Sequence, residues 1–345
     1  MGRRQQALKK WVLAQLIVSD PQMADALSLV PVAGDASFRR YFRVTYQQQS
    51  YVLMDAPPEH EDCQPFIQIA RQWHAAGIRV PRILAEDLTQ GFLMLEDFGD
   101  VLLRSVLQEK TADDLYCQAF DQLHRIQTLP AGVLPKYDAV LLQREMSLFR
   151  DWFLSSWLAL ELTDAESACL AAVEQRLIES ALEQPQVAVH RDYHSRNLML
   201  LPEGGIGVID FQDAVEGAAT YDLVSLLRDS YIHWPEAQVM QWVDRFHQQS
   251  PWAARLTAQE FRQAFDWMGM QRQLKVCGIF VRLCLRDGKA GYLQDIPLTL
   301  RNLWQSARRY PEFAEFACFL ESRVIPRLNQ RPELQALNLQ DWWKA

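Results

Sequence analysis

The feature that most constrains the fold is a segment in which three short apolar runs each meet a single polar residue. Residues 187–189 lead to Asp192, a second run begins after Asn197, and a third ends at Asp210. Two glycines at residues 204–205 separate the last two runs, which are therefore predicted to form a strand, a turn and a strand. Folding these strands together brings Asn197 and Asp210 to the same open end of a hairpin.

Asp192, Asn197 and Asp210 are residue types that phosphoryl transfer requires. Carboxylate and amide oxygens suit Mg²⁺, which takes its remaining ligands from water and phosphates. We therefore predict Asn197 and Asp210 as metal ligands and Asp192 as the catalytic base that accepts a hydroxyl proton. The H-x-D-x-x-x-x-N spacing, followed by an apolar strand ending in Asp-Phe, is typical of a kinase catalytic loop. Such residues also occur in turns and caps, but four matched positions in matched strand context favour the kinase interpretation.

The rest of the chain divides into a sheet-bearing start and a helical remainder. Aromatic, β-branched and apolar residues predict strands at 40–46, 51–54 and 91–95. Further along, apolar residues recur at three- and four-residue steps, as in the segment 138–160, which predicts helices. We predict an α+β fold with two lobes. A small N-lobe spans 1–97, and a larger, mainly helical C-lobe spans 98–345 and carries the catalytic hairpin, 187–210.

Charge and hydropathy exclude two classes of partner. The chain has 43 acidic and 35 basic residues, whereas nucleic-acid binding favours a basic surface because phosphate neutralisation dominates the affinity. No apolar run approaches the roughly 20 residues that span a bilayer. Leu8, Trp11 and Val12 recur at helical spacing, so the N-terminus is predicted to be an amphipathic helix rather than a signal peptide. We expect a cytoplasmic protein without a nucleic-acid or membrane partner.

The motifs around the hairpin resemble those of one enzyme superfamily. Ile209-Asp210-Phe211 and then Tyr221-Asp222-Leu223 follow the H-x-D-x-x-x-x-N loop, as in the aminoglycoside phosphotransferase and choline kinase superfamily. After Asp210-Phe211 the chain continues with Gln212 where protein kinases have the glycine of D-F-G, and it lacks an A-P-E segment, which favours a small-molecule substrate. The resemblance implies a protein-kinase-like fold, ATP as phosphoryl donor with Mg²⁺, and Asp222 as an anchor for the catalytic loop.

The resemblance also implies which residues contact ATP. A phosphate-covering loop would contribute Gly34, Ser37, Phe38, Arg39 and Arg40. Backbone groups around Glu96, at the hinge between the lobes, would pair with the adenine edge. The lysine that related kinases carry on the third strand is missing, since Met54-Asp55 stands at that position. Phosphate charge must then be met by an arginine (Arg39, Arg40 or Arg43), by the metal or by backbone groups. A non-catalytic nucleotide-binding module would also lack this lysine, but the retained Asp192, Asn197 and Asp210 favour activity.

Three further segments carry a narrower resemblance: Val52-Leu53-Met54-Asp55-Ala56-Pro57-Pro58, Arg144-Glu145-Met146-Ser147-Leu148-Phe149 and Tyr221-Asp222-Leu223-Val224-Ser225. Over nearly its full length the chain resembles bacterial anomeric sugar kinases of cell-wall recycling. That resemblance implies phosphorylation of N-acetylmuramate and N-acetylglucosamine at the C1 hydroxyl, which gives sugar 1-phosphates for peptidoglycan recycling. A sugar needs aromatic faces and hydrogen-bonding groups, and an acidic sugar needs an arginine partner. The candidate substrate residues are Glu145, Trp152, Arg191, Arg196 and Arg228. For Glu145 and Arg228, a solvated face or an ion pair is an equal alternative.

Two further classes of function stay open from the residues alone. A kinase of choline, homoserine or an aminoglycoside would share the same catalytic core, and a non-catalytic module would bind nucleotide without turnover. A cationic substrate would need clustered acids or an aromatic cage. We expect a monomer.

Overall fold

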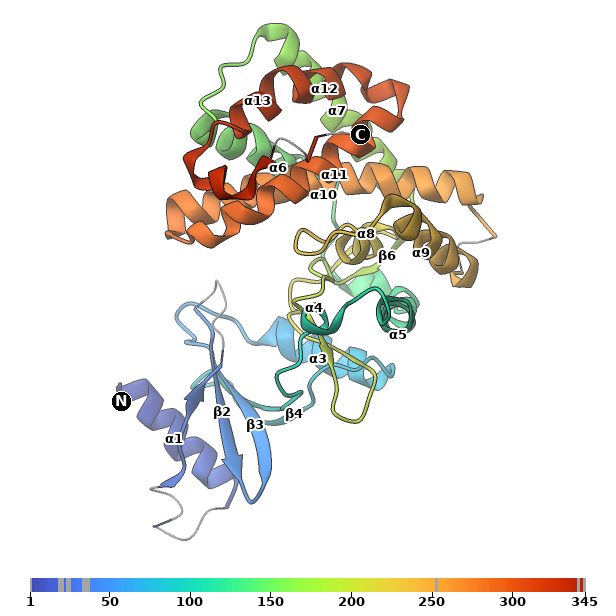
Figure 1. Cartoon of the computed structure of the whole chain (residues 1–345). Helices are drawn as coiled ribbons and strands as arrows, with labels where there is room; N and C mark the ends of the chain where they lie inside the picture. Colours follow the sequence, from blue (N-terminus) through green and yellow to red (C-terminus); the bar gives the residue numbers. More distant parts are fainter. Residues whose placement is uncertain are drawn as a thin grey trace. The chain divides into compact units, whose positions relative to one another are not determined.

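The computed structural model describes residues 2–17, 22, 26–32, 38–251, 254–339 and 342–343. The chain packs as two compact units, coloured by sequence in Figure 1. The sheet unit comprises Met1–Val106 and Asn197–Asp213, and the helical unit comprises Leu107–Arg196 and Ala214–Ala345. One unit holds the antiparallel sheet and the other is mainly helical, so the predicted α+β class is confirmed.

The sheet unit is built on a five-stranded sheet in the order β1-β2-β3-β5-β4. Its strands are β1 (Val30–Pro31), β2 (Arg40–Tyr46), β3 (Gln49–Asp55), β4 (Ile83–Asp87) and β5 (Phe92–Glu96), and its helices are α1 (Arg3–Gln15), α3 (Gln64–Ala75) and α4 (Leu103–Val106). All described pairings in this sheet are antiparallel. The strands predicted at 40–46, 51–54 and 91–95 correspond to β2, β3 and β5. The tight β2–β3 turn places Gln47 and Gln48 at φ angles of 47° and 67°, as a type I′ hairpin turn requires.

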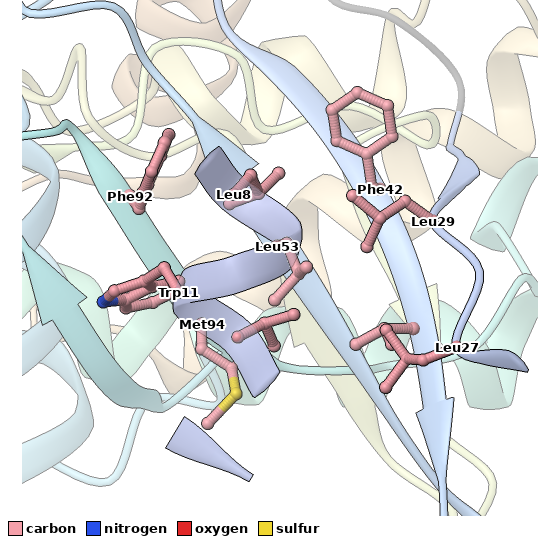
Figure 2. Close-up of a cluster of buried hydrophobic side chains, with 10 residues drawn as sticks. Leu8, Trp11, Leu27, Leu29, Phe42, Leu53, Phe92 and Met94 are labelled. Carbon is pink, nitrogen blue, oxygen red and sulfur yellow. The ribbon is translucent and has the colours of Figure 1, made fainter. Parts of the chain in front are cut away.

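Helix α1 covers one face of this sheet. Figure 2 shows Leu8 and Trp11 of α1 among Phe42, Leu53, Phe92 and Met94 of the strands. The amphipathic helix predicted at the N-terminus is therefore confirmed. Because side chains alternate along a strand, residues one step away, such as Met54, point to the opposite face.

A short hairpin from much later in the chain also belongs to the sheet unit. Its strands are β7 (Leu198–Leu200) and β8 (Ile206–Val208). The amide of Val208 donates to the carbonyl of Arg79 at 2.7 Å, which joins the hairpin to the segment between α3 and β4. A side chain at Gly207 would meet the Phe98 ring at 2.7 Å, so only glycine permits this close packing. After the hairpin, Phe211 packs against α3.

The helical unit is organised around the 30-residue helix α10 (Ala258–Asp287), which contacts α6, α7, α8, α9 and α11. The α-helices of this unit are α5 (Ala112–Gln127), α6 (Ala139–Leu148), α7 (Asp164–Glu183), α8 (Tyr221–Leu227), α9 (Glu236–Gln249), α10, α11 (Ile296–Arg309), α12 (Ala314–Phe319) and α13 (Ile325–Leu328). Its shorter helical segments are η1 (Ala131–Val133), η2 (Phe149–Trp157), η3 (Ala290–Asp295), η4 (Pro311–Phe313), η5 (Leu320–Val324) and η6 (Pro332–Leu337). Gly278 lets α10 approach α6 closely, because an added Cβ would lie 2.3 Å from the Leu148 backbone.

Two local features differ from the prediction. The segment 138–160, predicted to be one helix, is α6 followed by the π-helical η2, which shifts the side chains after residue 149 around the helix axis. The apolar run 187–189 forms β6 (Gln186–Val189), which pairs with β9 (Val215–Ala218) rather than with the β7–β8 hairpin. Strand β9 is four residues long and contains a glycine, so its sequence carries little strand signal. Within the described residues, no helix has the length and apolar character needed to cross a membrane.

Candidate active site

Asn197 and Asp210 meet at the open end of the β7–β8 hairpin. The Asn197 amide nitrogen donates to an Asp210 carboxylate oxygen at 3.2 Å, and the Asn197 carbonyl accepts from the Ile209 amide at 3.0 Å. Their predicted proximity is therefore confirmed. Asp210 adopts a φ of 64°, an uncommon backbone conformation for a residue with a side chain. Such conformations cost free energy and cluster at functional sites, where the surroundings hold them in place.

The donor atoms of this pair fit Mg²⁺. Asp210 offers carboxylate oxygens, and Asn197 offers an amide oxygen. A 180° rotation of the Asn197 side-chain amide exchanges its nitrogen and oxygen, and the oxygen then points toward the Asp210 carboxylate. Within the part of the chain that the structure describes, no group of three or more His, Cys, Asp or Glu side chains could hold a metal. Mg²⁺ in a kinase needs only one or two protein ligands, because the phosphates of the nucleotide complete its coordination. Metal binding by Asn197 and Asp210 stays a prediction.

The loop that carries Asp192 is anchored by two buried carboxylates of the helical unit. Asp222, in the first turn of α8, accepts from the amides of His190 at 2.6 Å and Arg191 at 2.9 Å. The predicted anchoring by Asp222 is confirmed. Burial raises the pKa of Asp222 to about 7, although the two amide donors oppose this rise. Asp229 accepts from the Ser195 amide at 3.0 Å, so the loop is held on both sides of Asp192.

The surroundings of Asp192 suit a carboxylate base. Burial by itself raises the pKa of Asp192, but interactions with Lys275, His194 and Arg272 outweigh it, and the pKa lies below its usual range. Asp192 is therefore ionised at neutral pH and can accept a hydroxyl proton. Its role as the catalytic base stays a prediction.

Sequence reasoning missed Lys275, which lies in α10 and is 6% exposed. Its ammonium group donates to the Tyr221 hydroxyl at 3.0 Å and lies 3.1 Å from a Glu145 carboxylate oxygen. Burial lowers the pKa of Lys275, but Tyr221, Glu145 and Asp192 outweigh this effect and raise it, so the lysine is charged. The available signal was a single lysine inside the apolar stretch 274–281.

Glu145 and Arg191, both predicted to contact substrate, belong to the same cluster as Lys275. The Arg191 guanidinium forms an ion pair with Glu145, and the Tyr137 hydroxyl donates to Glu145. Burial raises the pKa of Glu145, but the charges of Lys275 and Arg191 outweigh this effect and lower it. Arg191 has a φ of 81°, and it immediately precedes Asp192.

The other predicted substrate residues lie elsewhere in the helical unit. Trp152 is half-buried in η2, and the Arg196 guanidinium stacks on the Tyr231 ring at 3.7 Å. Arg228 is 4% exposed and donates to Glu236 at 2.6 and 2.8 Å and to Asp266 at 3.1 Å. For Arg228 this geometry favours the ion-pair alternative, and the substrate roles of these residues stay predictions.

The predicted phosphate-covering loop is described in part. Gly34 and Ser37 lie outside the described residues. The Phe38 amide donates to Glu61 at 3.1 Å, and the Phe38 ring stacks on the His60 ring with centroids 4.6 Å apart. Residues 60–61 precede α3, so this segment ties the end of the loop to that helix.

The three candidate arginines for phosphate have different partners. Arg39 lies 3.8 Å from the Glu61 carboxylate. Arg40 forms an ion pair with the fully buried Asp55, which Arg4 of α1 also contacts at 2.6 Å. Arg43 donates to Asp97 at 2.6 Å and to Asp100 at 2.8 Å. Each cation is therefore oriented by a carboxylate of the sheet unit.

Glu96, predicted at the hinge, ends β5. Its amide donates to the Arg82 carbonyl at 2.9 Å, and its carboxylate lies 3.2 Å from Arg79 and 3.1 Å from Arg82. Burial raises the pKa of Glu96, but its hydrogen bonds and the nearby arginines outweigh this effect and lower it. The adenine contact predicted at this position stays a prediction.

Comparisons with known proteins show the family to which the chain belongs. Residues 28–261 match the model described as the phosphotransferase enzyme family. The N-acetylmuramate/N-acetylglucosamine kinase of Pseudomonas aeruginosa is 47% identical over 85% of this chain and 88% of its own length. The kinase of the same name from Neisseria meningitidis is 40% identical over 93% of this chain and 96% of its own. The superfamily resemblance is therefore confirmed.

Solved structures of small-molecule kinases share the fold. An ethanolamine kinase of Plasmodium vivax superposes with a TM-score of 0.62 at 14% identity and covers 89% of each chain. The ADP-bound aminoglycoside phosphotransferase APH(2'')-Ib has a TM-score of 0.57 at 13% identity and covers 86% of this chain and 97% of its own. At such low identity the likeness shows the fold alone, and the predicted kinase-like fold is confirmed.

Proposed function

The chain belongs to the phosphotransferase enzyme family and groups within it with the N-acetylmuramate/N-acetylglucosamine kinases, and from this premise we propose its reaction. The protein transfers the γ-phosphoryl group of ATP to the anomeric C1 hydroxyl of N-acetylmuramate and N-acetylglucosamine. The sugar 1-phosphates then serve peptidoglycan recycling, and we propose the cytoplasm as the place of the reaction because ATP is consumed. The observation that carries the proposal is the H-x-D-x-x-x-x-N loop of Asp192, which Asp222 anchors through the amides of His190 and Arg191.

Asp192 accepts a hydrogen bond from the C1 hydroxyl and takes its proton as the oxygen attacks. The oxygen forms a bond to the γ-phosphorus, the bond from that phosphorus to the β,γ-bridging oxygen breaks, and ADP leaves with that electron pair. Asn197 and Asp210 would hold Mg²⁺, which supplies charge neutralisation at the β- and γ-phosphates. Phosphoryl transfer needs positioning and charge stabilisation more than covalent chemistry, and these side chains can supply both.

The third-strand lysine of related kinases is missing here, and Arg39 is the cation that we propose in its place. In protein kinases that lysine pairs with a glutamate of the neighbouring helix, whereas α3 contains no acidic residue. Arg40 shares its strand face with Phe42, the face that α1 covers, whereas Arg39 directly precedes the strand. Glu61, just before α3, lies beside Arg39. We infer that Arg39 and Glu61 supply the cation and carboxylate of the missing pair.

One assay tests the reaction. Purified protein with Mg²⁺ and ATP is offered N-acetylmuramate, N-acetylglucosamine, choline, homoserine and an aminoglycoside, and ADP release is measured. We expect turnover with the two amino sugars, and ³¹P NMR of the product should show phosphate coupled to the anomeric proton. Asp192→Asn is the matched control for contaminating kinases. Turnover confined to another acceptor would replace the substrate, and ATP binding without turnover would favour the non-catalytic module.

A further inference from the structure

The helical unit contains a buried cluster of opposite charges next to the catalytic loop. Lys275 of α10 and Glu145 of α6 are each 6% exposed, and they lie 3.1 Å apart. Glu145 also pairs with Arg191, and hydroxyl groups of Tyr137 and Tyr221 complete the hydrogen bonds. These contacts join three helices to the residue that precedes Asp192.

Stability alone is a weak explanation for this cluster. Removing charged groups from water is costly, and a buried ion pair often contributes no more than well-packed apolar side chains of similar volume. Such apolar packing was available, because Leu274, Val276 and Cys277 beside Lys275 are all buried. A charged lysine here therefore points to a role that an apolar residue could not fill.

The cluster holds the loop at Arg191, a residue with an uncommon backbone conformation. Arg191 has a φ of 81°, which a residue with a side chain rarely adopts. Asp222 holds the Arg191 amide at 2.9 Å, and Glu145 holds its guanidinium. Glu145 can remain ionised although it is buried, because the positive charges of Lys275 and Arg191 compensate its negative charge. The next residue along the chain is Asp192, so this backbone conformation sets where its carboxylate points.

We propose that Lys275 is a positioning residue of the phosphoryl transfer, which acts through Glu145 and Arg191 to hold the catalytic loop. This inference rests on the proposed function. The titratable and charged groups around Asp192 come from three elements: Lys275 and Arg272 from α10, His190 and His194 from the loop, and Asp222 from α8. Of these, Lys275 has the largest effect in favour of the ionised carboxylate.

The main test compares wild type with Lys275→Met. We expect kcat to fall on the order of 10²-fold, because a displaced catalytic group loses alignment. Loss of the cation raises the pKa of Asp192, so the acidic limb of the kcat/KM profile moves to higher pH. The histidines are present in both proteins, so the difference between the profiles reports Lys275. The KM for ATP should not change.

Two further variants separate this role from a structural one. Lys275→Arg keeps the charge and should restore the acidic limb to its wild-type position, and it serves if Lys275→Met fails to fold. Arg309→Met is the matched control. Arg309 pairs with Asp266 and lies 2.7 Å from Glu236, and neither carboxylate is among the groups around Asp192 named above. We expect that variant to lower Tm without moving the pH profile.

The outcomes are distinct. If Lys275→Met lowers Tm but leaves kcat and the acidic limb of the pH profile unchanged, Lys275 is structural and the inference is wrong. If kcat falls in Lys275→Met and the acidic limb does not move, the predicted effect of the lysine charge on Asp192 is wrong. Failure of the proposed function appears separately, as absent sugar phosphorylation by the wild type.

Discussion

The sheet unit and the helical unit hold positive charge in opposite ways. In the sheet unit, the side chains of Arg4 and Arg40 are 28% and 50% exposed and pair with one buried carboxylate. In the helical unit, Lys275 is buried together with its carboxylate partner. Solvent screens an exposed charge, whereas a buried charge keeps its full effect on its neighbours. Substitutions should therefore affect catalysis strongly around the loop of the helical unit and more mildly along the sheet.

The largest effect is expected at Asp192. Asp192→Ala and Asp192→Asn remove the base, and general-base groups contribute about 10² to 10⁴-fold to rate. We expect kcat to fall by that factor while ATP still binds, as measured by sugar 1-phosphate formation and by titration with a fluorescent nucleotide analogue. Near-wild-type turnover in either variant would mean that another group accepts the proton.

Asp222 provides the next test, at the anchor rather than at the base. Asp222→Ala leaves the amides of His190 and Arg191 without their acceptor, at a cost of about 1–3 kcal/mol for each unpaired buried group. We expect a lower free energy of unfolding, measured with urea, and a lower kcat. If both values equal those of wild type, the loop does not depend on this carboxylate.

The raised pKa of Asp222 also predicts how stability depends on pH. With a pKa of about 7 in the folded protein and a lower one when unfolded, the carboxyl group binds its proton more tightly in the folded state. Its contribution is complete at acid pH and is lost as pH rises through 7. The stability difference between wild type and Asp222→Asn should therefore shrink from pH 5 to pH 8. A constant difference would show that the anchor is ionised throughout.

The contrast between the units also explains what could be predicted from the sequence. Asn197 and Asp210 were found because the hairpin is local: a turn and two apolar runs dictate which ends meet. Lys275 was missed because its partners, Glu145 and Tyr221, come from distant helices, and helical periodicity does not specify which helices pack together. The partner of β6 was missed for a related reason, since β9 is short and carries little strand signal.

A similar reason applies to the arginines of the sheet unit. The sequence offered Arg39, Arg40 and Arg43 without a way to choose among them. Strand register sets Arg40 apart, because it places Arg40 on the face that helix α1 covers. Arg43 is set apart by its two carboxylate partners, Asp97 and Asp100. Register follows from the turn at Gln47 and Gln48, whose positive φ angles are visible only in the structure.

Substitution of Arg39 should have an intermediate effect on ATP binding, and it tests whether Arg39 rather than Arg40 contacts the phosphates. Arg39→Met should raise the KM for ATP about 10- to 150-fold, as expected for the loss of one charge-assisted contact worth about 1.5–3 kcal/mol, with the KM for sugar unchanged. Glu61→Gln should give a smaller change in the same direction. If Arg40→Met raises the KM for ATP more than Arg39→Met does, the assignment of the two arginines is reversed.

The smallest effects are expected where the pairs of the sheet unit face solvent. Arg4→Met leaves the buried Asp55 with one cation instead of two, and it also removes the contact of Arg4 with the Gln90 carbonyl at 2.6 Å. We expect the free energy of unfolding to fall by about 1–2 kcal/mol. Arg71→Met is the matched control, because its pair with Glu86 is exposed and worth less than about 1 kcal/mol. Both values come from urea denaturation, and kcat should not change in either variant. An Arg4 effect no larger than that of Arg71 would show that the burial of Asp55 gives this pair no added strength, and the contrast between the two units would then rest on Lys275 alone.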